Sequence, residues 1–228
     1  MKKRIFLYST SFKITILIII VFFLLAAKSP GTTQYVAANN MSDTTYIWNG
    51  KDFSNLKFVL RDNKVLSNSD YSIKDHVLSF NTKKVGYFRT EKKYSSFKIH
   101  AEWRWPEKVE KGNSGILVFI QPPDTVWPKC IQVNFKKDNA GDLIAMNGTM
   151  FKEATGKPND TALKLHKSNE KSFGEWNTCD AICQGDSILV YVNGKLQNRA
   201  THINVKSGTV GFQLEGKPIE FGNIYIVK

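Results

Sequence analysis

Hydrophobic and polar residues alternate along several segments of this 228-residue chain, most clearly between residues 97 and 105. The odd positions there are apolar: Phe97, Ile99, Ala101, Trp103 and Trp105. The even positions are polar: Lys98, His100, Glu102 and Arg104. Because successive side chains of a β-strand point to opposite faces of its sheet, the alternation predicts a strand with one buried and one polar face.

Further strands are expected wherever short apolar or alternating runs lie between turn-forming residues. The segments are 71–73, 77–80, 86–90, 115–121, 130–135, 178–183, 187–192, 195–197, 209–214 and 219–227. Asn193-Gly194 favours a tight hairpin, because both residues tolerate a positive φ. No amphipathic helix of three turns is evident, and residues 152–175 are predicted to form a long surface loop. Many short strands separated by turns predict an all-β, two-sheet antiparallel sandwich.

The first 27 residues differ from the rest, because a basic stretch precedes an apolar run at 14–27. The run is shorter than the roughly 20 residues of a membrane-spanning helix, which favours a signal peptide over an uncleaved anchor. We therefore expect residues 1–27 to be removed, leaving no stable membrane span. Residues 28–45 would then be a flexible segment and residues 46–228 the folded domain. This predicts a secreted or periplasmic protein.

The net charge and the cysteine content limit the classes of protein to which this chain can belong. The formal charge of +12 falls to +8 without the first 27 residues, which carry four basic and no acidic side chains. The remaining basic residues are spread along the chain, so a solvated surface is favoured and no nucleic-acid partner is predicted.

Cys179 and Cys183 would lie about 13 Å apart on one strand, too far for a disulfide. Cys130 could bridge to one of them, or all three could pack as thiols; packing is favoured. No Cys/His cluster has zinc-ligand spacing.

Seven segments, in order along the chain, carry a resemblance to a known family. They are Trp48-Asn-Gly-Lys-Asp-Phe53; residues 97–105 with Gly112-Asn-Ser-Gly-Ile116; Cys130-Ile-Gln-Val-Asn-Phe135 with Asn139-Ala-Gly-Asp142; Gly174-Glu-Trp-Asn177; Val192-Asn-Gly194; Gly208-Thr-Val-Gly-Phe-Gln213; and Ile219-Glu-Phe-Gly-Asn-Ile224. Together they make residues 46–228 similar to the 3-keto-disaccharide hydrolase family. The resemblance implies a concanavalin A-like jelly-roll fold and a carbohydrate ligand.

The resemblance also implies cleavage of a disaccharide whose ring carries a ketone at C3. That ketone acidifies the proton on C2, since the resulting carbanion is an enolate, and elimination of the C1 substituent then breaks the glycosidic bond. The reaction needs a base near C2, a group that stabilises the enolate oxygen and an acid for the leaving oxygen. A separate sugar 3-oxidoreductase is implied as the partner that makes the ketone.

Three residues depart from the family pattern. Gln132 stands where the pattern has glutamate, Asn134 where it has glutamine, and Gly222 where it has arginine. These changes leave open a second interpretation, a carbohydrate-binding module of the same fold with weakened catalysis. A weaker third interpretation is an adhesion or scaffold domain without a small ligand.

Side chains at every second position of a strand point to the same face of its sheet. On this basis we expect the polar side chains of the strands to line one concave face, which is the candidate site. Glu102 is the predicted catalytic base, and Arg104, or a metal held by Glu102, is the predicted enolate stabiliser. The predicted sugar-binding residues are His100, Asn113, Gln132, Asn134 and Gln213, with Trp127 stacking on a sugar ring. Apart from that metal, no cofactor is predicted.

Each of these assignments has a structural alternative. Glu102 and Arg104 could be cross-strand partners on a solvated face. Gln132 is favoured as a sugar-binding amide rather than a catalytic group, since an amide cannot take up a proton near neutral pH. Asn113 could equally belong to a turn, because Asn and Gly suit turn geometry.

Overall fold

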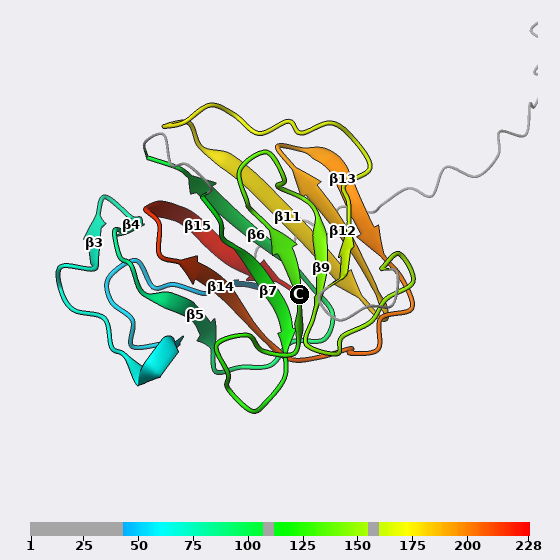
Figure 1. Ribbon diagram of the computed structural model, residues 1–228, viewed down its shortest axis with the longest axis horizontal. Helices are drawn as coiled ribbons and strands as arrows, with labels where there is room; N and C mark the ends of the chain where they lie inside the picture. The colour runs from blue at the N-terminus through cyan, green and yellow to red at the C-terminus, as the bar shows by residue number, and fades with distance from the viewer. Residues whose placement is uncertain (1–42, 107–111, 155–159) are drawn as a thin grey trace, which may run out of the picture. The chain divides into compact units, whose positions relative to one another are not determined.

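Two antiparallel sheets make up the fold in the computed structural model, which describes residues 43–106, 112–154 and 160–228 (Figure 1). The eight-stranded sheet contains, in spatial order, β13 (Lys195–Ala200), β12 (Ser187–Val192), β11 (Asn177–Gln184), β6 (Phe97–Arg104), β15 (Ile219–Val227), β4 (Val77–Phe80) and β3 (Tyr71–Lys74), with β1 (Thr44–Tyr46) also paired to β15. The seven-stranded sheet contains β10 (Asp160–Ala162), β9 (Leu143–Met146), β8 (Cys130–Asn134), β7 (Gly115–Ile120), β14 (Thr209–Glu215), β5 (Val85–Thr90) and β2 (Leu56–Leu60). The predicted all-β, two-sheet sandwich is confirmed.

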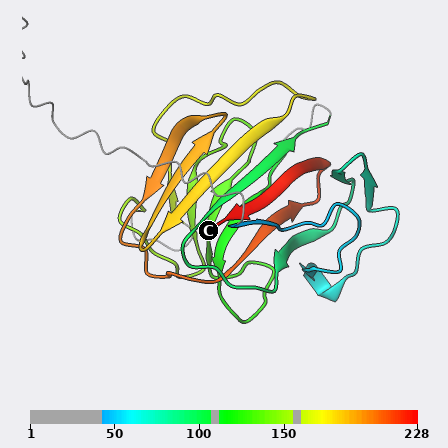
Figure 2. The same cartoon turned by 180° about the vertical axis from the view of Figure 1, so that it is seen from behind.

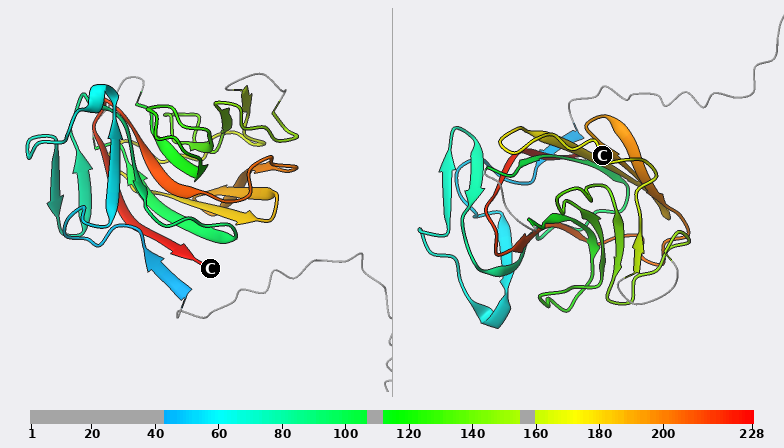
Figure 3. Two further views of the ribbon diagram at one scale, coloured as in Figure 1. Left: turned by 90° about the horizontal axis from the view of Figure 1, so that it is seen from below. Right: turned by 45° about the horizontal axis from the view of Figure 1, so that its top comes forward.

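The core lies between the two sheets, which Figure 3 shows as stacked layers. From the eight-stranded sheet, Ile99 and Trp103 point inward, and they pack in one cluster with Ile131 of the seven-stranded sheet. Trp103 is fully buried and stacks on Phe135, with ring centroids 4.0 Å apart. Burial of each large apolar side chain stabilises the fold by roughly 1.5–3 kcal/mol relative to exposure. The alternation in the sequence thus builds the core.

The ends of the folded region pair with each other. Strand β1 runs beside β15 near the C-terminus (Figure 2). Thr44 lies opposite Val227, and Tyr46 lies opposite Tyr225. This strand includes two residues of the segment expected to be flexible. Residues 28–42 of that segment and the predicted signal peptide lie outside the described residues. In the described part of the chain, no helix has the length and apolar content needed to cross a bilayer.

All of the predicted strands are present, and their ends differ from the expected ends by at most three residues. The hairpin after β12 turns at Asn193 and Gly194, whose φ angles are 47° and 75°, as predicted. Four short strands were not predicted: β1, β2, β9 and β10. β10 falls within the predicted loop 152–175, so that expectation is wrong for residues 160–162. These strands have three to five residues, too few for the alternation to stand out.

The three cysteines are free thiols, and all are buried. Cys179 and Cys183 lie on β11 and point into the core. Cys130 belongs to a separate apolar cluster with Leu117 and Met146, on the other face of the seven-stranded sheet. The favoured prediction of packing thiols is therefore confirmed.

Candidate functional site

The predicted site residues do not share one concave face. The buried residues of β6 point into the core, so His100, Glu102 and Arg104 project from the outer face of the eight-stranded sheet. Ile131 and Val133 of β8 also point into the core, so Gln132 and Asn134 project from the outer face of the seven-stranded sheet. The prediction of a single shared hollow is wrong, because the core separates the two groups.

A pocket of about 650 Å³ lies on the outer face of the seven-stranded sheet. Its lining consists of Asn113, Thr125, Val126, Trp127, Gln132, Ile144, Met146, Asn147, Gln213 and Glu215. We call it the sheet pocket. Strands β8, β9 and β14 supply its floor, because each directs alternate side chains outward from the seven-stranded sheet. Four of the predicted sugar-binding residues are thus brought together: Asn113, Gln132, Gln213 and Trp127.

A chain of side-chain hydrogen bonds crosses the pocket floor. Gln132 Nε2 donates to Gln213 Oε1 at 2.7 Å, and Gln213 Nε2 donates to Glu215 Oε1 at 2.9 Å. Gln132 Nε2 also donates to the carbonyl of Ser114 at 3.3 Å. Both amides are almost fully buried, with 3% of each residue exposed. The chain fixes the orientation of the amides and ends on a carboxyl group.

Glu215 is the functional candidate that sequence reasoning missed. It is the one carboxyl-bearing residue of the pocket lining. Burial raises its pKa, an effect that the positive charge of Arg61 partly offsets. Carboxyl groups with perturbed pKa values in pockets are typical of proton-transfer sites. The alternation of side chains along a strand could have identified this residue, because Glu215 follows Gln213 by two positions on β14 and therefore lies on the same face of the sheet.

Trp127 and Asn113 stand at the pocket wall. Trp127 is 38% exposed, and its carbonyl accepts hydrogen bonds from Thr125 Oγ1 at 3.0 Å and Asn147 Nδ2 at 3.2 Å. These contacts hold the loop that presents its indole ring. Asn113 Oδ1 is buried and has no hydrogen-bond partner among the described residues. An exposed aromatic face beside amide groups suits a sugar ring, which is apolar on its faces and polar at its rim.

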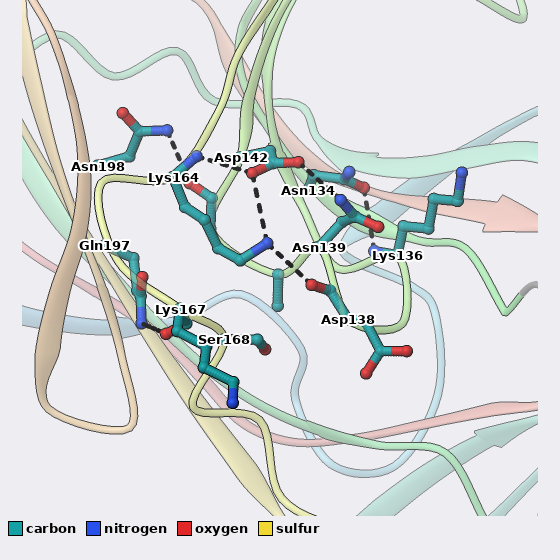
Figure 4. A network of polar contacts seen from close by, with 12 residues as sticks. Asn134, Lys136, Asp138, Asn139, Asp142, Lys164, Lys167, Ser168, Gln197 and Asn198 are labelled. Atoms are coloured by element: carbon teal, nitrogen blue, oxygen red, sulfur yellow. Dashed lines mark hydrogen bonds and ion pairs between the residues drawn. The ribbon is translucent and has the colours of Figure 1, made fainter.

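A second hollow of about 350 Å³ adjoins the sheet pocket and shares Asn113 and Ile144 with it. Asn134, the remaining predicted residue of this face, lies here. Figure 4 shows the polar network beside it, in which the Lys164 ammonium donates to the carbonyl of Asp138 at 2.8 Å. The buried carboxylate of Asp142 accepts from the backbone N–H of Lys164 at 2.8 Å. These bonds fix the wall of a groove that continues the pocket along the sheet.

The outer face of the eight-stranded sheet holds the other predicted residues in a different arrangement. Arg104 forms an ion pair with Glu220, and its guanidinium lies 4.6 Å from the centroid of the Trp176 ring. Arg104 is therefore a cross-strand partner, as the alternative expected, but of Glu220 rather than Glu102. Glu102 lies opposite Gly222 on β15.

His100 has structural partners on this same face. Its Nδ1 lies 2.9 Å from Asp180 Oδ1, and its ring stacks on Tyr225 with centroids 4.8 Å apart. Among the described residues, no group of three or more His, Cys, Asp or Glu side chains is arranged to hold a metal ion.

Comparison with known proteins gives one family. A model of the 3-keto-alpha-glucoside-1,2-lyase-like domain matches residues 43–227. A comparison with curated proteins found no match.

Solved structures share the fold at low identity. A glycosyl hydrolase-like protein from Parabacteroides distasonis has a TM-score of 0.60 and 20% identity, covering 82% of this chain and 94% of that one. The carbohydrate-binding module CBM66 from Bacillus subtilis has a TM-score of 0.56 and 10% identity, covering 78% and 98%. The β-glucanase from Bacillus licheniformis has a TM-score of 0.56 and 13% identity, covering 83% and 100%. At these identities the likeness establishes the concanavalin A-like sandwich alone.

Proposed function

Since the chain belongs to the 3-keto-alpha-glucoside-1,2-lyase-like domain family, we propose that it cleaves a 3-keto-glycoside in the sheet pocket, with Glu215 moving the C2 proton. The observation that carries the proposal is a half-buried carboxyl group in the pocket, held by the amide of Gln213. The proposal transfers the role of base, assigned to Glu102 from the sequence, to a residue on the opposite face.

The chemistry that the family implies suits this carboxyl group. The C3 ketone makes the C2 proton removable, and the base must be ionised yet strong enough to take it. Once protonated, Glu215 can give this proton to the leaving oxygen as the C1–O bond breaks, and water then adds across C1 and C2. Burial raises the pKa of Glu215, so its carboxylate is a stronger base than that of an exposed glutamate. A positioned group of this kind contributes about 10²–10⁴ in rate.

Amide N–H groups would bind the sugar oxygens. Gln132 already donates to Gln213 and to Ser114, so both of its amide protons are engaged. Gln213 uses one amide proton on Glu215, which leaves the other free to stabilise the enolate oxygen. The amide of Asn113 stands at the junction of the two hollows, where a second sugar ring would begin.

One observation favours a second candidate function, a carbohydrate-binding module. Gln132 occupies the family's glutamate position on the pocket floor, and an amide transfers no proton near neutral pH. The pocket lining also contains no lysine or arginine to stabilise an enolate. In this case the protein would bind the sugar without cleaving it. Both proposals include export of the protein and a sugar 3-oxidoreductase that supplies the ketone.

The experiment measures cleavage and binding of a 3-keto-glucoside by the purified protein and two matched variants. Glu215→Gln is expected to lower the cleavage rate about 10²–10⁴-fold while calorimetric binding persists. Glu102→Gln, an identical change on the other face, is expected to leave the rate unchanged. Loss of activity in Glu102→Gln but not in Glu215→Gln would overturn the assignment. Binding without cleavage by the wild type, with cleavage restored by Gln132→Glu, would favour the binding module.

A further inference from the structure

A third hollow, of about 390 Å³, lies where β1, the β3–β4 turn and β15 meet, and it includes no residue of the sheet pocket. It is lined by Tyr46, Trp48, Asn49, Gly50, His76, Asn223 and Ile224. We call it the β1 hollow. Two segments that the sequence singled out meet here, 48–53 and 219–224, and the sheet pocket uses neither of them.

We propose that the β1 hollow is a second carbohydrate-binding site, which takes a neutral sugar ring. The inference does not depend on cleavage in the sheet pocket. Its lining contains no aspartate, glutamate, lysine or arginine, so it offers nothing to neutralise a charged ligand. It offers instead an aromatic wall with amide and imidazole groups, which match a ligand with an apolar face and a rim of hydroxyls.

The aromatic wall is held in place before any ligand binds. Tyr46 is 60% exposed, and its ring makes an edge contact with Tyr225 at 5.8 Å between centroids. Tyr225 stacks in turn on His100, which Asp180 anchors at 2.9 Å. In the same lining, the buried indole of Trp48 donates to the carbonyl of Asp52 at 3.1 Å. A stacking ring that is already oriented loses little entropy on binding.

The polar groups come from backbone positions that are unusual for side-chain-bearing residues. His76 has a φ of 59° in the β3–β4 turn, and Asn223 has a φ of 43° within the bulge of β15. A bulge of this kind redirects a side chain away from the sheet pattern. Within the described residues, neither side chain is engaged in a hydrogen bond, so both remain available to a ligand.

Gly50 leaves space for the His76 imidazole in the wall of the β1 hollow. A Cβ atom at Gly50 would lie 3.1 Å from His76 Nδ1, and the φ of Gly50 is +77°. The absence of a side chain therefore leaves room for the imidazole beside the loop. Asn49 rigidifies the same loop, because its Oδ1 accepts the backbone N–H of Lys51 at 2.8 Å and of Asp52 at 2.9 Å.

The test uses residue-resolved NMR of the purified protein titrated with maltose and with cellobiose, two neutral disaccharides that carry no ketone. Saturable shifts are expected at Tyr46, His76 and Asn223. Tyr46→Ala is expected to weaken this binding roughly 3- to 10-fold, because the stacking surface is lost. Asn223→Asp keeps a residue that tolerates positive φ but removes the amide donors, and it should also weaken binding.

The controls separate this site from the sheet pocket. Tyr46→Ala should leave cleavage of a soluble 3-keto-glucoside unchanged, whereas Glu215→Gln should leave the shifts at Tyr46 unchanged. Shifts confined to Trp127 and Gln213, or no saturable shifts with either disaccharide, would overturn the proposal. Equal binding by the wild type and by a folded Tyr46→Ala variant would also overturn it.

Discussion

Replacing Gln132 by glutamate tests the hydrogen-bond chain of the sheet pocket. The side chain of Gln132 faces two acceptors, Gln213 Oε1 at 2.7 Å and the Ser114 carbonyl at 3.3 Å. A carboxylate in its place would donate to neither. Gln213 could turn its amide toward the new carboxylate, but Glu215 would then lose the donor that lies 2.9 Å away. Two carboxylates would therefore compete for one amide group.

The loss of stability follows from these contacts. Each donated hydrogen bond contributes about 0.5–1.5 kcal/mol, and a buried carboxylate facing acceptors costs about 1–3 kcal/mol more. A total near 3 kcal/mol is expected at neutral pH. For a domain of this size, that corresponds to a fall in Tm of roughly 6–12 °C.

The effect should depend on pH in a defined direction. Burial and the neighbouring Glu215 raise the pKa of the introduced carboxyl in the folded state above its unfolded value. The folded variant therefore binds a proton more readily than the unfolded chain, so its stability relative to the wild type increases as pH falls. Once protonated, the introduced group can donate to Gln213 as the amide did. The gap in Tm should be smaller near pH 5 than near pH 8.

Thermal unfolding of the wild type, Gln132→Glu and Gln132→Met at both pH values checks this reasoning. Gln132→Met also lacks the donors but carries no titratable group, so its gap from the wild type should stay constant with pH. A Gln132→Glu gap that is equally large at both pH values, or absent at both, would refute the proposed competition for the amide of Gln213.

Three further predictions follow from single contacts. Trp127→Ala should raise KM for a 3-keto-glucoside about 3- to 10-fold with little change in kcat, because it removes a stacking surface and no proton-transfer group; steady-state kinetics checks this. The Arg89 hydrogen bond lowers the pKa of Asp124 to about 2 against an opposing effect of burial, so Asp124 stabilises the fold above its unfolded pKa, and this contribution is lost as pH falls. Asp124→Asn should therefore lower Tm at pH 7, and the difference from the wild type should narrow between about pH 4 and pH 2. Gly211→Ala should lower the free energy of unfolding by more than about 2 kcal/mol, because its Cβ would lie 2.4 Å from the Phe88 carbonyl. Gly194→Ala, where φ is +75° and the surrounding space is open, should lower it by about 1 kcal/mol. Denaturant unfolding measures both values.

The sequence predicted which face of a strand each residue occupies, but not which faces belong together. Parity correctly grouped His100 with Glu102 and Gln132 with Asn134, because side-chain direction along a strand depends on the local backbone alone. Joining the two groups required knowing the sheet of each strand. β6 pairs with β11 and β15, about 80 and 120 residues further along the chain, whereas β8 pairs with β7 and β9 in the other sheet. The β6 pairings are set by long-range packing, which no local pattern records, so the sequence did not show that β6 and β8 lie in different sheets.

The structure also changes what the departures from the family pattern mean. Gln132 lies on the floor of the sheet pocket and Asn134 in the adjoining hollow, so both can affect the bound sugar. Gly222 lies on the opposite sheet, opposite Glu102, and a Cβ there would be 3.6 Å from the Trp176 ring. An arginine at this position would project beside Glu102 and Trp176, with the core between it and the pocket. Its absence therefore bears on the outer face of the eight-stranded sheet and gives no reason to consider the pocket inactive. The case for a weakened enzyme rests mainly on Gln132, since Asn134 keeps an amide, and Glu215 supplies within the same pocket the carboxyl group that Gln132 lacks.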